Sequence, residues 1–134
     1  LGNLGLASAL EILAREFTDQ SGVRVTCALD PVTLTPDAEL TIYRLVQEAI
    51  TNVAKYARAH NVEVRLRASD ACVDISVSDD GVGFDPTRRR QSAYGLMGMR
   101  YRVEALGGKL ELVSKPGHGA TISARIPKAA VAAA

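Results

Sequence analysis

The sequence predicts an α/β fold: a two-layer sandwich with a mixed β-sheet covered on one face by three helices. Five short segments alternate apolar and polar residues, as strands with one dry face do. Three longer segments repeat apolar residues at helical spacing. Strands buried on both faces would be apolar throughout, so the helices should cover only one side of the sheet. Two pairs of consecutive strands could form hairpins, which predicts antiparallel pairing within the sheet.

The first part of the chain should form a helix, a strand and a second helix. Residues 4–20 repeat leucine and phenylalanine at helical spacing, and residues 23–28 alternate as a strand. Thr35 can cap the next helix, and Pro36 suits its first position. This central helix is expected to run to about Arg58.

The second part supplies four more strands and one helix. The strands are predicted at residues 62–67, 73–78, 109–112 and 120–126. A long glycine-rich loop is expected over residues 79–94, followed by a third helix over residues 95–106. The predicted domain spans residues 1–127, and the alanine-rich tail 128–134 is expected to be frayed.

Composition narrows the possible functions. The 134 residues are 47% hydrophobic and 23% charged, with a formal net charge of +1, which suits one soluble domain without a basic surface for nucleic acid. No apolar run is long enough to cross a membrane. The chain starts at Leu1 without a charged leader, so we expect an excised fragment. Cys27 and Cys72 are expected to be buried thiols in a reducing compartment, and neither has a zinc-ligand spacing with His60 or His118.

The central helix carries the first candidate site. At roughly 100° per residue, Glu48, Asn52 and Lys55 fall within about 60° of one another, opposite the apolar side. The carboxylate can accept a proton, the amide oxygen can hold a hard cation, and the ammonium can pair with phosphate. The alternative is an ordinary solvated helix face.

Two glycine-rich segments follow. In residues 79–84 a strand ends at Asp79, whose carboxylate can accept a hydrogen bond from an exocyclic amine, while Gly81 and Gly83 let the backbone approach a ligand. In residues 94–100, glycines at a helix start would leave N–H groups open to an anion. A tight turn and a closely packed helix start are the respective structural alternatives.

Two further segments carry weaker signals. Residues 116–121 fit a simple hairpin turn between two strands. The arginines at 88–90 could meet phosphates as part of a flexible lid, but the composition favours a solvated run of charge.

Taken in order, these segments resemble the ATP-binding catalytic domain of sensor histidine kinases, which has the Bergerat ATP-binding fold. The resemblance runs from Leu4 to Pro127 and is greatest to the subfamily that feeds nitrate-response-type regulators. It rests on four motifs: Gln47-Glu48-Ala49-Ile50-Thr51-Asn52-Val53-Ala54-Lys55-Tyr56-Ala57, Asp79-Asp80-Gly81-Val82-Gly83-Phe84, Gly95-Leu96-Met97-Gly98-Met99-Arg100 and Gly117-His118-Gly119-Ala120-Thr121.

The resemblance implies a role for each matched residue. Glu48 would be the general base or polarising carboxylate, Asn52 would hold Mg²⁺, and Asp79 would accept from the adenine amino group. A lid over residues 85–94 would cover the phosphates. The implied ATP-binding residues are Asn52, Lys55, Tyr56, Asp79, Gly81, Gly83, Phe84, Tyr94, Gly95, Leu96, Gly98 and Thr121.

The same resemblance implies partners that this chain does not contain. The phosphoacceptor histidine would lie on a separate dimerisation domain, and a response regulator with a helix-turn-helix output would receive the phosphoryl group. The domain is expected to be cytoplasmic and monomeric in isolation, although its parent protein can be membrane-anchored. Tyr56 departs from the histidine usual in the subfamily, which puts the proton chemistry beside Glu48 in doubt. The alternatives are an anti-sigma-type serine kinase and a non-catalytic, nucleotide-gated interaction module.

Overall fold

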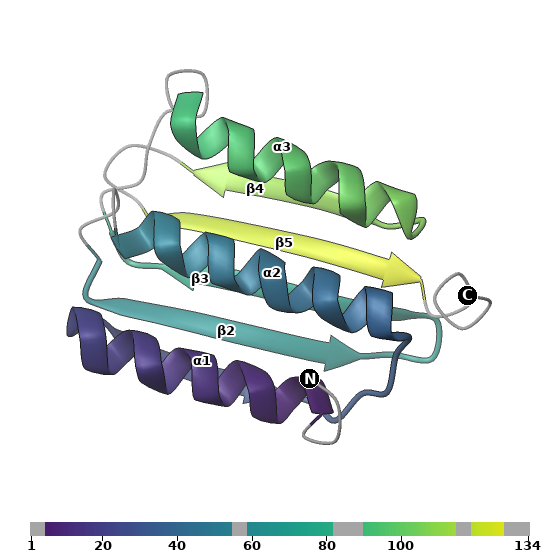
Figure 1. The fold of residues 1–134 in the computed structure, drawn as a ribbon, viewed down its shortest axis with the longest axis horizontal. Helices are drawn as coiled ribbons and strands as arrows, with labels where there is room; N and C mark the ends of the chain where they lie inside the picture. Colours follow the sequence, from purple (N-terminus) through teal and green to yellow (C-terminus); the bar gives the residue numbers. More distant parts are fainter. Residues whose placement is uncertain (1–4, 55–58, 82–89, 115–118, 128–134) are drawn as a thin grey trace.

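A computed structural model describes residues 5–54, 59–81, 90–114 and 119–127, with the backbone alone described for residues 90–97. It contains one five-stranded mixed sheet with three helices packed on one of its faces, as Figure 1 shows. The elements are α1 (Gly5–Ser21), β1 (Arg24–Leu29), α2 (Pro36–Asn52), β2 (Asn61–Ala68), β3 (Cys72–Asp79), α3 (Arg90–Ala105), β4 (Lys109–Ser114) and β5 (Ala120–Pro127). The predicted two-layer sandwich is therefore confirmed.

The sheet order is β1-β2-β3-β5-β4. β1 pairs with β2 in parallel, because α2 lies between them in the chain, and the remaining pairs are antiparallel. Both predicted hairpin pairs, β2 with β3 and β4 with β5, are present. β5 enters between β3 and β4, so the strand that follows β3 in the chain is not its neighbour in the sheet.

The core lies between the helices and the helix-facing side of the sheet. In β2 and β3 every second residue is buried, which follows from the two-residue period of a strand. Leu66, Ile75 and Ile126 of the sheet and Ile42 of α2 are fully covered. Polar and charged side chains occupy the outer side, which explains the apolar–polar alternation of the sequence.

The start of α2 follows the expected capping chemistry. Thr35 has an extended backbone, and its hydroxyl accepts a hydrogen bond from the N–H of Ala38 at 3.3 Å. Pro36 takes the first helical position, where its missing N–H costs nothing. The helix ends at Asn52 and continues into a wider, π-type turn at Val53 and Ala54, while the expected extension to Arg58 falls outside the described residues.

Two expectations require correction. α3 begins at Arg90, five residues before the predicted start at 95, so the last part of the predicted loop 79–94 is helical. The earlier helix start was not predicted, because Gly95 and Gly98 lower the helix propensity of this segment. One or two glycines inside a helix are nevertheless tolerated. Cys27 and Cys72 are half-buried free thiols, where we expected buried ones, because β1 is an edge strand and Cys72 lies on the outer side of the sheet.

Candidate functional site

The predicted site residues converge on one end of the sheet. The C-terminal end of α2, the end of β3, the end of β4, the start of β5 and the start of α3 all meet there, at the left in Figure 1. Strand pairing places Asp79 opposite Ala120, and Ala120 opposite Ser114. The topology therefore gathers motifs that are more than 60 residues apart in sequence.

Asp79 lies at the centre of this end. It continues the buried series Val73, Ile75 and Val77, so its side chain is on the helix-facing side of β3. The N–H of Gly81 donates to its Oδ1 at 2.8 Å, which closes a tight turn directly after the strand. The carboxylate is thus held in a half-buried position beside the helical layer.

The surroundings of Asp79 act on its charge in opposite directions. Burial raises the pKa of Asp79 above its ordinary value of 3.8, and the neighbouring charge of Asp80 raises it further. The backbone N–H groups of Gly81 and Ala120 favour the charged form and oppose that rise. A partly desolvated carboxylate suits recognition of an amino group, because each of its two oxygens can accept more than one hydrogen bond.

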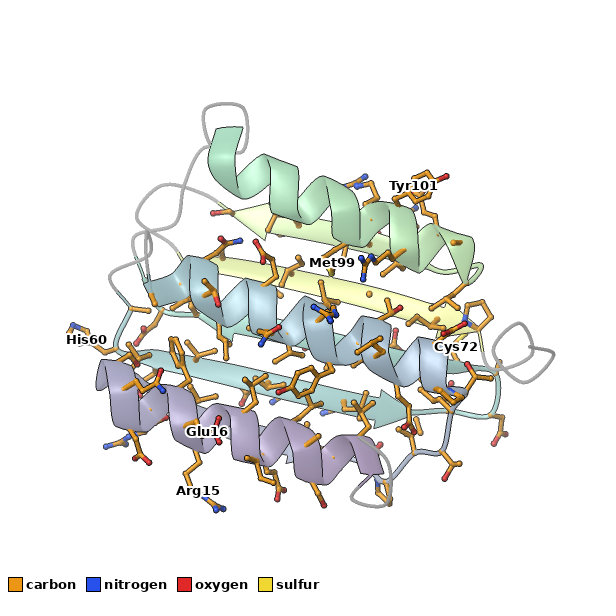
Figure 2. All side chains as sticks on the ribbon, viewed as in Figure 1. Arg15, Glu16, His60, Cys72, Met99 and Tyr101 are labelled. Atoms are coloured by element: carbon orange, nitrogen blue, oxygen red, sulfur yellow. The ribbon has the colours of Figure 1, made fainter. Side chains whose placement is uncertain are left out.

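Asp80 faces the other way and binds the start of β2. Its Oδ1 accepts from the N–H groups of His60 and Asn61, both at 2.9 Å, and its Oδ2 accepts from the Asn61 side-chain amide at 2.9 Å. These hydrogen bonds lower the pKa of Asp80 to about 2, and the bond from the Asn61 side chain has the largest effect. This role of Asp80 was not predicted from the sequence, because its hydrogen-bond partners lie 19 and 20 residues away along the chain. His60 marks this end of the molecule in Figure 2.

The α2 residues Glu48 and Asn52 are separated by one helical turn and share a helix face. Both are half-buried, so this face is neither core nor fully solvated. Asn52 is the last residue of α2, at the end of the helix that lies over the strand end carrying Asp79 (Figure 1). Lys55 and Tyr56 follow in the chain but lie outside the described residues.

The second glycine-rich segment has a different setting from the expected one. Tyr94, Gly95, Leu96 and Gly98 lie inside α3, and the N–H groups that a helix leaves free belong to residues 90–93. Gly95 and Gly98 therefore lie more than one turn after the start of α3, not at the helix start as expected, and their contact with phosphate stays a prediction. A Cβ added to Gly98 would meet no described atom within 4 Å, so none of the described neighbours requires a glycine there.

Thr121 lies one strand away from Asp79 but on the opposite side of the sheet. Its hydroxyl is 3.0 Å from that of Ser78, its register partner on β3. The alternation of β5 puts Ile122 on the helix side and Thr121 on the outer side. Gly83 and Phe84, the other predicted members of this region, lie outside the described residues.

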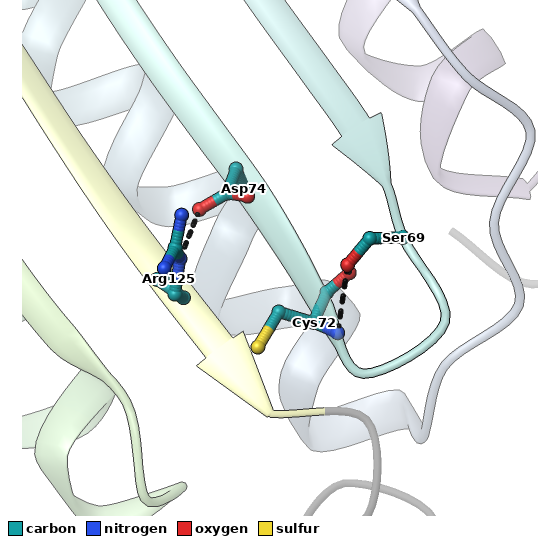
Figure 3. A network of polar contacts seen from close by, with 4 residues as sticks. All are labelled: Ser69, Cys72, Asp74 and Arg125. Atoms are coloured by element: carbon teal, nitrogen blue, oxygen red, sulfur yellow. Dashed lines mark hydrogen bonds and ion pairs between the residues drawn. The ribbon is translucent and has the colours of Figure 1, made fainter.

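Polar contacts at the opposite end of the sheet are unrelated to the candidate site. Figure 3 shows the ion pair of Arg125 with Asp74 at 2.9 Å and the turn in which Ser69 bonds the backbone of Cys72. Both contacts are exposed, and an exposed ion pair of this kind adds little stability.

The oxygen donors fit a hard cation that is shared with a ligand. Within the described ranges, no group of three or more histidine, cysteine or acidic side chains could hold a metal by itself. Glu48 and Asn52 offer a carboxylate and an amide oxygen one turn apart. Mg²⁺ is usually held by one or two protein oxygens together with substrate phosphates, so these residues suit a nucleotide-bound ion.

Comparison with known proteins agrees with this geometry. Residues 37–130 match the family described as histidine kinase-, DNA gyrase B-, and HSP90-like ATPases. The chain is 34% identical over 129 residues to the signal transduction histidine-protein kinase/phosphatase DegS of Brevibacillus brevis, covering 95% of this chain and 33% of DegS. It is 30% identical over 123 residues to the sensor histidine kinase LiaS of Bacillus subtilis, covering 92% of this chain and 34% of LiaS.

Solved structures share the fold. The histidine kinase domain of the Erythrobacter litoralis EL346 blue-light activated kinase superposes with a TM-score of 0.79 at 23% identity, covering 96% of this chain and 65% of that one. The Acinetobacter baumannii histidine kinase AdeS gives a TM-score of 0.74 at 16% identity, covering 90% and 64%. At these identities the likeness establishes the fold alone.

Fold and site together define an ATP-binding domain built as a one-sided α/β sandwich. The chain belongs to the family of histidine kinase-, DNA gyrase B- and HSP90-like ATPases, because the match covers well over half of its length. It spans about a third of the length of DegS and of LiaS. No helix among the described residues is long and apolar enough to cross a membrane.

Proposed function

We propose that this chain is the ATP-binding catalytic domain of a two-component sensor histidine kinase. It would bind Mg·ATP and transfer the γ-phosphoryl group to a histidine on a dimerisation domain outside this chain. A response regulator, with a helix-turn-helix output as the subfamily resemblance implies, would then receive the group. DegS and LiaS, both histidine kinases by name, support this assignment within the ATPase family.

The observation that carries the proposal is the position of Asp79. Its half-buried carboxylate lies on the helix-facing side of β3, at the end of the sheet where α2 presents Glu48 and Asn52. In the proposed complex Asp79 would accept from the adenine amino group, and Asn52 would hold an Mg²⁺ ion, whose charge would offset that of the phosphates. Glu48 would either accept a proton from the attacking histidine as a general base or polarise that histidine.

The remaining predicted residues take supporting roles in this proposal. Gly81 and Gly83 admit the base, Lys55 pairs with phosphate, and Tyr56 lies against the nucleotide. Phe84, Tyr94, Leu96 and the glycines 95 and 98 border the phosphates with the lid. Thr121 stabilises the end of β3 through its hydrogen bond with Ser78 on the outer side of the sheet.

Thermal unfolding is the first test. Ligand at about 100 times its dissociation constant adds roughly 2.7 kcal/mol to the folded state, enough to shift the melting temperature of a domain of this size by several degrees. Mg·ATP should produce that shift and Mg·GTP should not. No shift with millimolar ATP would contradict the site.

Phosphoryl transfer separates the kinase from its alternatives. The chain, mixed with a separately produced acceptor domain of the parent kinase and labelled ATP, should phosphorylate a histidine of that domain and yield an acid-labile phosphohistidine. Glu48→Gln should keep ATP binding and lose transfer, whereas the control Glu16→Gln on the exposed side of α1 should keep both. An alkali-labile phosphoserine on a partner would favour the anti-sigma-type serine kinase. ATP binding without transfer by the unaltered chain would favour the interaction module.

A further inference from the structure

We propose that Asp80 is a positioning residue for nucleotide recognition: by binding the start of β2, it holds Asp79 and Gly81 in the arrangement that selects adenine. The inference rests on the proposed function, because it takes Asp79 as the adenine acceptor. Asp80 itself is exposed, and the side-chain hydrogen bonds described for it go to His60 and Asn61, which are not among the proposed nucleotide-binding residues.

The Asp80 carboxylate is used on both of its oxygens. Oδ1 accepts hydrogen bonds from the successive backbone N–H groups of His60 and Asn61, and Oδ2 accepts one from the Asn61 side-chain amide. All three distances are 2.9 Å. Bonds to a charged acceptor are stronger than neutral ones, and three of them leave the side chain little freedom.

The backbone continues this connection across three strands. The N–H of Asp80 donates to the Asn61 carbonyl at 3.2 Å, and the N–H of Arg24 donates to the His60 carbonyl at 3.0 Å. The starts of β1 and β2 and the end of β3 are thereby joined at one point. This point lies at the end of the sheet where Val62 of β2 pairs with Asp79 of β3.

The consequence for the site follows from chain connectivity. Asp79 and Gly81 flank Asp80, and the Gly81 N–H must reach back to the Asp79 carboxylate to close the turn. Anchoring the residue between them fixes the path of that turn. Without the anchor, the turn could rotate, and the Asp79 carboxylate would lose its fixed direction toward a ligand.

The hydrogen-bond pattern explains the choice of aspartate over asparagine. An asparagine at position 80 could still accept the two backbone bonds through its oxygen, but it would lose the negative charge, and its NH₂ group could bond Asn61 only after the Asn61 amide had turned its oxygen toward it. The pKa of about 2 keeps the carboxylate charged at all physiological pH values, so the anchor is permanent. Exchanging both residues, Asp80→Asn with Asn61→Asp, reverses donor and acceptor and keeps the net charge.

This exchange gives a direct test. Calorimetric dissociation constants for ATP and GTP should be measured, well below the melting temperature, for the unaltered chain, for Asp80→Asn and Asn61→Asp alone, and for the double variant. Each single variant should lose about tenfold or more in ATP affinity, as expected when a charged hydrogen-bond network is broken, and should discriminate less between ATP and GTP. The double variant should recover most of both.

The matched control is Asp30→Asn. Asp30 Oδ2 accepts from the N–H of Ala68 at 2.9 Å, so this residue anchors the opposite end of β2 with a similar bond. The control should leave the ATP-to-GTP ratio unchanged even where it lowers the melting temperature. A ratio unchanged in Asp80→Asn, or an equal change in Asp30→Asn, would overturn the positioning role.

Amide hydrogen exchange separates this inference from the proposed function. In the nucleotide-free chain, Asp80→Asn should accelerate exchange of the Gly81 amide, and the double variant should slow it again. If the unaltered chain fails to prefer ATP over GTP, the adenine assignment of Asp79 falls, and Asp80 has no role in selectivity. The exchange rate of the Gly81 amide still tests whether Asp80 positions the turn. An unchanged rate in Asp80→Asn would refute the positioning role.

Discussion

A Cβ atom placed on Gly119 would overlap the backbone carbonyl oxygen of Asp79. Gly119 also has a φ of +75°, a conformation that L side chains rarely adopt. The backbone of Gly119 therefore packs directly against the strand end that carries the proposed adenine acceptor. Close approach, and not only turn geometry, requires glycine at this position.

Gly119→Ala should consequently destabilise the domain through both strain and overlap. Gly22→Ala is the matched control, since Gly22 has a φ of +77° but no atom within 4 Å of its added Cβ. The control should lose about 1–2 kcal/mol from the left-handed conformation alone, and Gly119→Ala should lose more. Urea unfolding of both variants measures the difference, and equal losses would show that the contact with Asp79 is relieved at no cost.

Asp79→Asn tests the adenine contact. The amide keeps the shape of the side chain but loses the charge that strengthens its acceptor bond, which should weaken ATP binding by roughly 1–3 kcal/mol. Calorimetry with ATP and GTP gives the affinities. Asp74→Asn, on the exposed outer side of the same strand, is the control and should bind like the unaltered chain. An unchanged preference for ATP over GTP in Asp79→Asn would contradict the assignment.

Stability in acid should depend on Asp80. Its pKa in the folded chain is about 2, below the ordinary value of 3.8, so the unfolded state binds more protons between these values. The contribution of Asp80 is therefore present above pH 3.8 and is lost as the pH falls toward 2. Asp79 acts in the opposite direction, because its raised pKa favours the protonated folded state.

Urea midpoints recorded across this pH range should reveal the Asp80 contribution. The unaltered chain should lose more stability on acidification than Asp80→Asn, which has no carboxyl group to titrate at that position. Parallel pH profiles for the two proteins would mean that the three hydrogen bonds do not stabilise the charged form.

Thr35→Ala removes the cap of α2. The lost bond to the Ala38 N–H should cost about 1 kcal/mol of unfolding free energy, a typical value for a helix cap. Thr33→Ala, two residues earlier at an exposed position, should cost much less. Equilibrium unfolding in urea compares them. A similar loss in both variants would assign the effect to side-chain propensity in the loop instead of the cap.

The layered fold could be predicted because burial alternates strictly along β2 and β3. Every second residue is apolar, so the sequence itself records which side of each strand is covered. Thr35 and Pro36 marked the start of α2 for a similarly local reason. The insertion of β5 between β3 and β4 was not predictable in this way, because alternation contains no information about which strands are neighbours.

The candidate site was predictable where chemistry and motif coincide, as at Glu48, Asn52 and Asp79. The start of α3 was missed because glycine lowers helix propensity without forbidding a helix. The bond between Asp80 and Asn61 was missed because it joins two strand ends across a hairpin, and only the register of β2 and β3 brings them together.

The position of β5 also constrains how the domain can form during synthesis. β3 and β4 both leave the ribosome before β5, yet each borders it in the sheet. Until residues 120–127 emerge, β3 has one exposed edge and β4 has no strand partner. The nascent chain therefore holds an unfinished sheet until β5 has emerged. Gly119 and Ala120, which lie beside Asp79, are made after both β3 and β4.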